Sequence, residues 1–296
     1  MQEEERAAQD GDGTRPLHGR RAPALGRRPP ARQPALEQAD DEHQRGRDGS
    51  VVLHDERRIR VDAFPISIDF EATQRVAAQP RTRRRAAEIR AGLGGPRRML
   101  LGVDRLDYTK GIEQRLEAYG RLLADGDLRA DDTVFVQVAT PSRQRLAQYA
   151  SLRDRVERLT GRLNGAYSGV GHNVVHYTSR QYSFDELVAL FAAADVMVTT
   201  PLSDGMNLVA KEYVGSRVDN RGALVLSEFA GASAELDQAL LVNPNDAEEL
   251  RGAMLLAAGM RPDEQRRRME IMRGHLQRHD VRAWVRSFLD ALRMSA

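Results

Sequence analysis

The sequence lacks several features that would assign a protein to a class at once. It has no cysteine and one tryptophan among 296 residues. Without cysteine, the chain forms no disulfide framework, thiolate nucleophile or cysteine-ligated zinc site. No apolar run approaches the roughly 20 residues of a membrane-spanning helix, and the polar N-terminus does not resemble a secretory signal. We therefore expect a soluble, cytoplasmic protein without a membrane partner.

Three common catalytic fingerprints are also missing. The sequence contains no G-x-S-x-G nucleophile elbow, no Walker phosphate loop and no G-x-G-x-x-G dinucleotide loop, so the hydrolase, nucleoside-triphosphatase and dehydrogenase classes lose their usual support. The formal net charge is +2 and the pI is about 9.1. The basic residues do not form a patch on a recognisable nucleic-acid module, so we expect no nucleic-acid partner.

The first part of the chain differs in composition from the rest. Residues 1–49 are rich in Arg, Ala, Pro, Gly and Gln, contain no aromatic residue and show no periodicity. Such a segment buries too little apolar surface to offset its ordering entropy, so we expect a disordered, non-homologous tail. A second segment, 50–95, predicts a hairpin from 51–53 and 59–64, followed by one helix over 73–91.

Strand-like and helix-like segments then alternate through the third segment, 96–296. Continuous apolar strands separated by amphipathic helices predict a Rossmann-like α/β fold, a parallel sheet with helices on both faces. From Asp246 onward the pattern is helical only, ending with a helix over 281–294 around Trp284. The expected strands lie at 99–103, 134–138, 174–177, 196–199, 223–227 and 240–242.

The stretch T-P-L-S-D-G-M-N-L-V-A-K-E-Y at 200–213 follows the fourth of these strands. In an open α/β sheet, ligands bind just beyond the carboxyl end of a strand, where the next helix offers unpaired N–H groups. Asp204 and Glu212, about two helical turns apart, are placed to accept hydrogen bonds from hydroxyls. This arrangement suits a nucleotide-sugar; the alternative is a strand–turn–helix that binds nothing.

Three cations follow the first two strands of the sheet. Arg105 and Lys110 lie after the first strand and Arg143 after the second, so all three are expected at one edge. An arginine fork and a lysine point charge together suit a diphosphate and stabilise its charge as a glycosidic bond breaks. The alternative for the first two is ion pairing with Asp104 and Asp107, and for Arg143 an exposed surface position.

The histidines are weaker candidates. His275 and His279 share a helix face at i, i+4 spacing, but no third metal ligand is evident, and a solvated face is the better interpretation. We expect no metal site. His172 and His176 flank the third strand, and we expect their side chains to be structural or exposed.

Several long motifs, in order along the chain, resemble trehalose-6-phosphate synthase. The resemblance covers about residues 51–294. The motifs are F-P-I-S-I-D at 64–69, V-D-R-L-D-Y-T-K-G at 103–111, A-T-P-S-R at 139–143, S-D-G-M-N-L-V-A-K-E-Y at 203–213, S-E-F-A-G-A at 227–232 and L-V-N-P at 241–244.

The resemblance implies the C-terminal domain of a two-domain, GT-B type retaining glycosyltransferase. It implies transfer of glucose from UDP-glucose, or another NDP-glucose, to glucose 6-phosphate, with no cofactor and no metal. It also implies front-face attack, in which the departing phosphate helps to deprotonate the acceptor. That scheme differs from the two-carboxylate mechanism of retaining glycosidases.

The resemblance also implies a role for each matching residue. Arg105, Lys110 and Asp204 are the expected catalytic residues, and the two cations hold the donor diphosphate. Glu212 holds the ribose, and Arg143 reaches the phosphate of the acceptor. The donor glucose hydroxyls bind Asp204 and the backbone of Gly205, Met206 and Asn207. The phosphates bind the start of the helix, at Leu208 and Val209.

The sequence departs from the family before residue 64, where the family carries a whole N-terminal domain. We therefore expect a truncated synthase that retains the donor half, with the final helix exposing part of its apolar face. Two alternatives stay open: a non-catalytic donor-binding remnant, and a related transferase with another phosphorylated acceptor such as glycerol 3-phosphate. The nucleotide base and the formation of a homo-oligomer are open as well.

Overall fold

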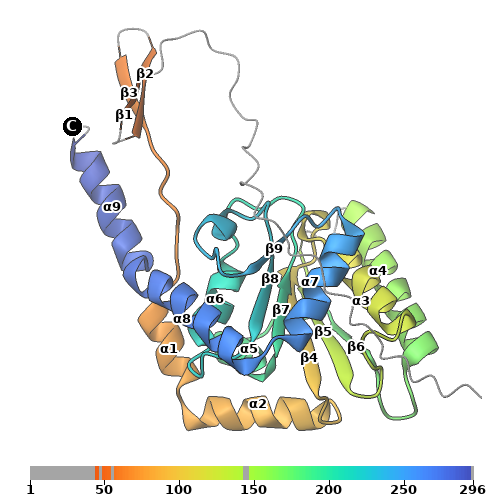
Figure 1. Cartoon of the computed structure of the whole chain (residues 1–296). Helices are drawn as coiled ribbons and strands as arrows, with labels where there is room; N and C mark the ends of the chain where they lie inside the picture. Colours follow the sequence, from red (N-terminus) through yellow and green to blue (C-terminus); the bar gives the residue numbers. More distant parts are fainter. Residues whose placement is uncertain (1–43, 47–48, 55–56, 143–146, 295–296) are drawn as a thin grey trace, which may run out of the picture. The chain divides into compact units, whose positions relative to one another are not determined.

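A parallel sheet of six strands organises the part of the chain that the structure describes (Figure 1). The computed structural model describes residues 44–46, 49–54, 57–142 and 147–294. The expected apolar segments are confirmed as strands and differ from them only at their ends. The strands are β4 (Arg98–Arg105), β5 (Thr133–Thr140), β6 (Val175–Thr178), β7 (Val196–Thr199), β8 (Ala223–Ser227) and β9 (Leu240–Val242).

The strand order, β6-β5-β4-β7-β8-β9, reverses direction in the middle of the sheet. From β4 the chain moves outward through β5 and β6, and it then returns to place β7 on the other side of β4. Leu100 pairs with Val196 and Leu101 with Met197 across this junction. In doubly wound sheets of this order, ligands bind at the carboxyl ends of the two strands where the order reverses.

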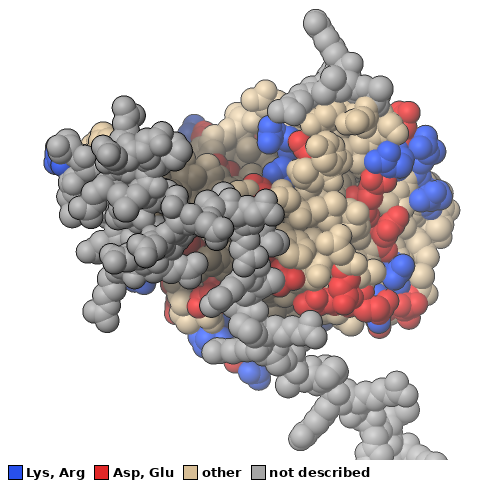
Figure 2. Space-filling model, turned by 90° about the horizontal axis from the view of Figure 1, so that it is seen from above, with Lys and Arg blue, Asp and Glu red and all other residues tan. Residues whose placement is uncertain are grey.

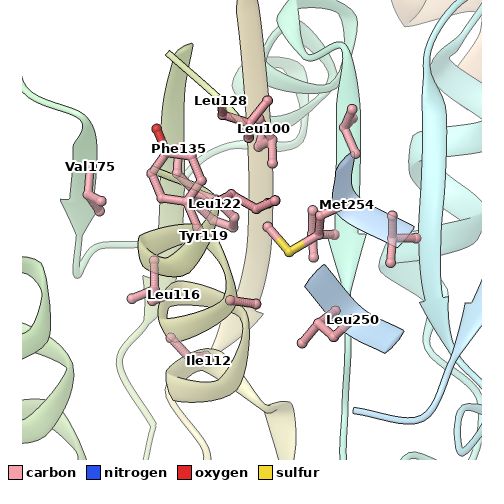
Figure 3. Close-up of a cluster of buried hydrophobic side chains, with 14 of the residues drawn as sticks. Leu100, Ile112, Leu116, Tyr119, Leu122, Leu128, Phe135, Val175, Leu250 and Met254 are labelled. Atoms are coloured by element: carbon pink, nitrogen blue, oxygen red, sulfur yellow. The ribbon is translucent and has the colours of Figure 1, made fainter. Parts of the chain in front are cut away.

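Helices cover both faces of the sheet, as expected. On one face lie α3 (Ile112–Ala124), α4 (Ala147–Tyr167) and α7 (Ala247–Gly259). Their apolar side chains form a core with alternate strand residues, so that Tyr119 of α3 packs among Leu100 and Phe135 (Figure 3). Burial on both faces explains why the inner strands, β4, β5, β7 and β8, are largely apolar.

The second face is covered by helices from three separate parts of the chain. They are α1 (Phe70–Ala77), α2 (Pro80–Gly92), α5 (Phe184–Ala193), α6 (Leu208–Ser216) and α8 (Pro262–Arg278). Side chains alternate between the two faces along each strand. Those that point away from the first core, such as Met99 and Leu101, form a second core with Phe191 of α5 and Tyr213 of α6.

The single helix expected over 73–91 is wrong, because two helices, α1 and α2, occupy this region. Pro80 is the first residue of α2, and Gln79 before it is extended, with φ −67° and ψ 140°. A proline disfavours helical geometry in the preceding residue and lacks an N–H donor, yet it fits the first position of a helix. The break therefore follows from local chemistry.

The expected hairpin is confirmed as β2 (Gly49–His54) and β3 (Arg57–Val61). A third strand, β1 (Gln44–Gly46), pairs with β2 and lies inside the segment expected to be disordered. The remainder of the expected tail lies outside the described residues.

The last helix, α9 (Val281–Met294), has the expected bounds and an exposed apolar face. Its anchor is Trp284, whose indole Nε1 donates to the Phe64 carbonyl at 2.9 Å. Val285, Phe288, Leu289 and Leu292 are exposed. No helix in the described part of the chain combines the length and the apolar character needed to cross a membrane.

Candidate functional site

The β4 loop, residues 106–111, turns the chain sharply from β4 into α3. Asp107 caps a short 3-10 helix, η1 (Tyr108–Lys110), and its carboxylate accepts from Thr109 N at 3.0 Å and from Thr109 Oγ1 at 2.9 Å. Burial tends to raise the pKa of Asp107, but these bonds and one from Tyr149 outweigh it and lower the pKa. Asp107 is thus a structural cap.

The β7 loop, residues 200–207, lies directly against the β4 loop. Leu202 N donates to Thr109 O at 2.7 Å. Gly111 has φ +63°, and a Cβ at this position would overlap the Thr200 carbonyl oxygen. Only glycine combines this left-handed conformation with so close an approach, so the two loops at the reversal of the strand order are in contact.

The ion pairs expected as the alternative for Arg105 and Lys110 do not form. Asp104 is paired instead with Arg115 of α3, at 2.7 Å, and both side chains are buried. The Arg105 side chain is exposed and makes no hydrogen bond or ion pair with any residue that the structure describes. Burial raises the pKa of Asp104, while the Arg115 guanidinium acts in the opposite direction.

Lys110 reaches across to the β7 loop. Its Nζ lies 2.7 Å from Asp204 Oδ2, and both side chains are largely buried, with 12% and 18% exposed. An ammonium has three donors, so this contact leaves two of them for a ligand. The structure thereby brings together two of the expected catalytic residues from strands far apart in the sequence.

Backbone hydrogen bonds join the β7 loop to the chain that follows β8. Asp204 N donates to Phe229 O at 3.1 Å, and Gly231 N donates back to Asp204 O at 3.0 Å. Ala232 N donates to Met206 O at 2.7 Å. The β7 loop, which contains Asp204, Gly205 and Met206, is therefore hydrogen-bonded both to the β4 loop and to the chain after β8.

Asn207 starts α6 from a left-handed conformation, with φ 80°. Its Oδ1 accepts from Ala210 N at 3.0 Å, and its Nδ2 donates to Asp204 Oδ2 at 3.1 Å. The helix begins at Leu208, as expected, and the N–H groups of Leu208 and Val209 have no partner within the helix. The N-terminal end of α6 therefore offers free N–H donors and the positive end of the helix dipole.

Glu212 lies one turn further along α6. It is partly buried, burial raises its pKa, and its carboxylate has no hydrogen-bond partner among the described residues. A partly buried carboxylate without a donor is costly unless a ligand supplies one. This position therefore suits hydroxyl groups.

The histidines have structural surroundings. His172 Nε2 lies 2.7 Å from Ala130 O, and burial lowers the pKa of His176. His275 does not lie on a solvated face as expected: it is partly buried, 3.3 Å from Glu235, and stacks on His279. Among the described residues, no group of three His, Cys, Asp or Glu side chains could hold a metal ion.

Two fully buried cations were missed from the sequence. One expected cation, Arg143, lies outside the described residues. The missed residues are Arg115 and Lys211, both with 0% exposed side chains. Lys211 donates to Ile66 O and to Glu235 Oε1. For Arg115 the sequence carries a signal, because it shares the helical spacing of the apolar stripe that includes Leu116.

Charge on the surface is mixed. On the face drawn in Figure 2, Lys and Arg side chains lie among Asp and Glu side chains. Arg251, for example, pairs with Asp125 at 3.3 Å and with Asp127 at 2.6 Å.

Comparison with known proteins identifies relatives over most of the chain. The family model of glycosyltransferase family 20 matches residues 35–294, which begins inside the segment 1–49. The chain is 57% identical over 248 residues to the trehalose-6-phosphate synthase of Mycobacterium avium (strain 104), covering 84% of this chain and 50% of the relative. The enzyme of Mycobacterium tuberculosis (strain ATCC 25618 / H37Rv) is 56% identical over the same length. The chain spans about half the length of the curated relatives that it matches.

Solved structures give the same result. An α,α-trehalose-phosphate synthase (UDP-forming) from Burkholderia xenovorans, in complex with glucose-6-phosphate, superposes with a TM-score of 0.81 at 34% identity. That match covers 86% of this chain and 56% of the other. An E. coli structure bound with UDP-2-fluoro glucose superposes with a TM-score of 0.76 at 34% identity, covering 82% and 55%.

Proposed function

The chain belongs to glycosyltransferase family 20, and from that premise we propose that it binds UDP-glucose where β4 and β7 end. We propose further that the glucose is transferred to glucose 6-phosphate, giving trehalose 6-phosphate and UDP. The observation that carries the proposal is the 2.7 Å contact between Lys110 and Asp204. This contact places a cation suited to phosphate, Lys110, beside a carboxylate suited to hydroxyls, Asp204. Both lie where the strand order of a doubly wound sheet reverses.

Each part of the donor has a matching group in the site. Arg105, which has no partner among the described residues, and the two remaining donors of Lys110 bind the diphosphate. The N–H groups of Leu208 and Val209 at the start of α6 add to this binding. Glu212 accepts hydrogen bonds from the ribose hydroxyls.

The donor glucose lies on the β7 loop in this proposal. Asp204 accepts from its hydroxyls, and the backbone of Gly205, Met206 and Asn207 lines the same side. Because neighbouring loops already hold this backbone in place, binding requires little ordering of the site.

The transfer step follows from this placement. The bond between glucose C1 and the diphosphate oxygen breaks, and the acceptor hydroxyl oxygen bonds to C1 on the same face. The acceptor proton passes to the departing phosphate oxygen. Arg105 and Lys110 stabilise the negative charge that develops on the diphosphate as it leaves.

For the acceptor we propose glucose 6-phosphate, with Arg143 contacting its phosphate. The Burkholderia xenovorans relative is in complex with glucose-6-phosphate, which favours this sugar phosphate over glycerol 3-phosphate. The nucleotide is proposed as UDP because the same relative is UDP-forming and the E. coli structure holds UDP-2-fluoro glucose.

Calorimetric titration with UDP-glucose tests the donor site. We expect saturable binding by the wild type and a loss of at least about 100-fold in the Arg105→Ala/Lys110→Ala double variant, since hydrogen bonds from charged groups contribute about 1.5–3 kcal/mol each. The matched control is Arg129→Ala/Arg293→Ala, which removes two exposed cations that belong to neither loop. Absence of binding by the folded wild type would refute the donor site.

A turnover assay tests the reaction separately. The chain is incubated with UDP-glucose and either glucose 6-phosphate or glycerol 3-phosphate, and products are identified by mass spectrometry. Trehalose 6-phosphate is the expected product. Donor binding without any transfer product would contradict the proposed reaction while leaving the donor site intact.

A further inference from the structure

A buried arginine lies directly behind the two cations of the donor site. Arg115 is in the first turn of α3, and its side chain is 0% exposed. It shares its helix face with Ile112 and Leu116, which belong to the apolar core. A charge in such surroundings is unfavourable unless it is paired and hydrogen-bonded.

All three guanidinium nitrogens of Arg115 are engaged. Nη1 donates to Asp104 Oδ2 at 2.7 Å and to Val198 O at 2.9 Å. Nη2 donates to Lys110 O, and Nε donates to Gly111 O at 3.3 Å. One planar group therefore connects the end of β4, the β4 loop and β7.

Neighbouring residues leave room for this group. A Cβ on Gly102 of β4 would lie 2.8 Å from Arg115 Nη1 and closer still to Gln137 Oε1. The strand thus carries a residue without a side chain where the guanidinium lies. Lysine would reproduce these contacts only in part, because one ammonium nitrogen does not match a planar fork that meets four acceptors from three nitrogens.

The contacts of Arg115 determine what the site cations can do. Asp104 and Arg105 are successive residues of β4, so their side chains point to opposite faces of the strand. Asp104 is buried and pairs with Arg115, whereas the Arg105 side chain is exposed and has no partner among the described residues. Because Lys110 O is bound from behind, the Lys110 backbone is held while its Nζ reaches Asp204. Without Arg115, the buried Asp104 carboxylate would attract Lys110, with which it already interacts electrostatically.

We propose that Arg115 is a positioning residue of the donor site, which fixes the β4 loop and neutralises Asp104 so that Lys110 faces the diphosphate beside Arg105. The inference rests on the proposed function and deepens it by naming the residue that orients Lys110. It differs from a purely structural role, in which Arg115 would support folding and leave the donor affinity of the folded protein unchanged.

The test compares variants that remove or displace the guanidinium. Arg115→Met/Asp104→Leu replaces the buried pair by apolar side chains of similar size, a change that proteins often tolerate. Gly102→Ala keeps Arg115 but pushes against the flexible ends of Arg115 and Gln137. Arg115→Lys keeps the charge and loses the fork.

For each folded variant, UDP-glucose affinity is measured by calorimetry at low and high salt, and folding by thermal unfolding. We expect affinity at least about tenfold weaker in the double variant, with partial retention in Arg115→Lys. We also expect a smaller loss of affinity with added salt, since misplaced cations contribute less electrostatic attraction to the diphosphate.

The outcomes separate the two claims. If the wild type does not bind UDP-glucose, the proposed function itself fails. If the wild type binds and the folded variants match both its affinity and its salt dependence, the positioning role is overturned. Should the double variant not fold, Gly102→Ala decides: unchanged affinity and salt dependence contradict the inference, and a selective loss of donor binding supports it.

Discussion

The two loops that meet where the strand order reverses are held in place by different means. The β4 loop depends on side chains: the Arg115 guanidinium binds its carbonyls, and Asp107 caps its 3-10 helix. The β7 loop depends on main-chain bonds to the chain after β8 and on Asn207. The first loop presents the Lys110 cation next to Arg105 at the end of β4, and the second presents its backbone and the Asp204 carboxylate. Charge placement here is therefore adjustable by single substitutions, whereas the backbone of the β7 loop is fixed by the fold.

The largest expected effect comes from substituting the glycine at which the loops touch. Gly111→Ala would add a Cβ that overlaps the Thr200 carbonyl oxygen, in a residue with φ +63°. We expect a loss of at least about 3 kcal/mol in unfolding free energy, which combines left-handed strain of about 1–2 kcal/mol with the overlap. Denaturant unfolding measures it.

Gly126→Ala is the matched control for that substitution. Gly126 also has a positive φ, +73°, but nothing lies within 4 Å of its added Cβ. Its cost should therefore be the conformational part alone, about 1–2 kcal/mol. Equal losses in the two variants would show that contact between the loops does not restrict residue 111.

An intermediate effect is expected at Asn207, on the β7 side. Asn207→Ala removes the cap to Ala210 N and the bond to Asp204 from a residue with φ 80°. We expect a loss of about 1–2 kcal/mol in unfolding free energy. Asn207→Gly relieves the backbone strain and should lower the unfolding free energy by only about a few tenths of a kcal/mol. If alanine and glycine were equally tolerated, the cap would not hold this loop.

The smallest expected effect is at Glu212, and it depends on pH. Burial raises the pKa of Glu212 in the folded protein, and in the proposed site the ionised carboxylate accepts more strongly from the ribose hydroxyls than the protonated acid does. Donor affinity should therefore weaken as the pH falls through this raised pKa, at a higher pH than for an ordinary glutamate. Glu212→Gln should lower affinity at neutral pH about fivefold, the equivalent of one hydrogen bond, and flatten the pH profile.

Ionisation of Glu212 should have the opposite effect on stability: it strengthens donor binding but lowers the stability of the unliganded protein. Since the folded state holds the proton more tightly than the unfolded state, ionisation of Glu212 destabilises the unliganded protein as the pH rises above the ordinary glutamate range. Glu212→Gln should accordingly raise the melting temperature without ligand at neutral pH, and exposed Glu117→Gln is the control. A lower melting temperature in Glu212→Gln would show that the carboxylate is structurally paired.

Much of the fold could be predicted because its signals are local. The central strands β7 and β8 are buried on both faces and are therefore apolar runs, so they were expected at their observed residues. The break between α1 and α2 was also encoded locally, by Pro80, and the helical periodicity over 73–91 concealed it.

The partners of the site residues could not be predicted in the same way. Arg105 and Asp104 are adjacent in sequence, yet Asp104 is paired with Arg115 on the following helix. Lys110 meets Asp204 only after the chain has passed through three further strands, β5, β6 and β7. Such pairings depend on three-dimensional distances that charge spacing along a sequence does not contain.

The return of the chain from β6 to β7 has a consequence for synthesis on the ribosome. The residues of the Lys110–Asp204 contact are 94 positions apart, and chains grow at about 5–20 residues per second. The cation-bearing half of the site thus emerges roughly 5–20 s before the half that completes it. During that interval β4 lacks its neighbour β7, and its exposed edge is open to chaperones or to another nascent chain.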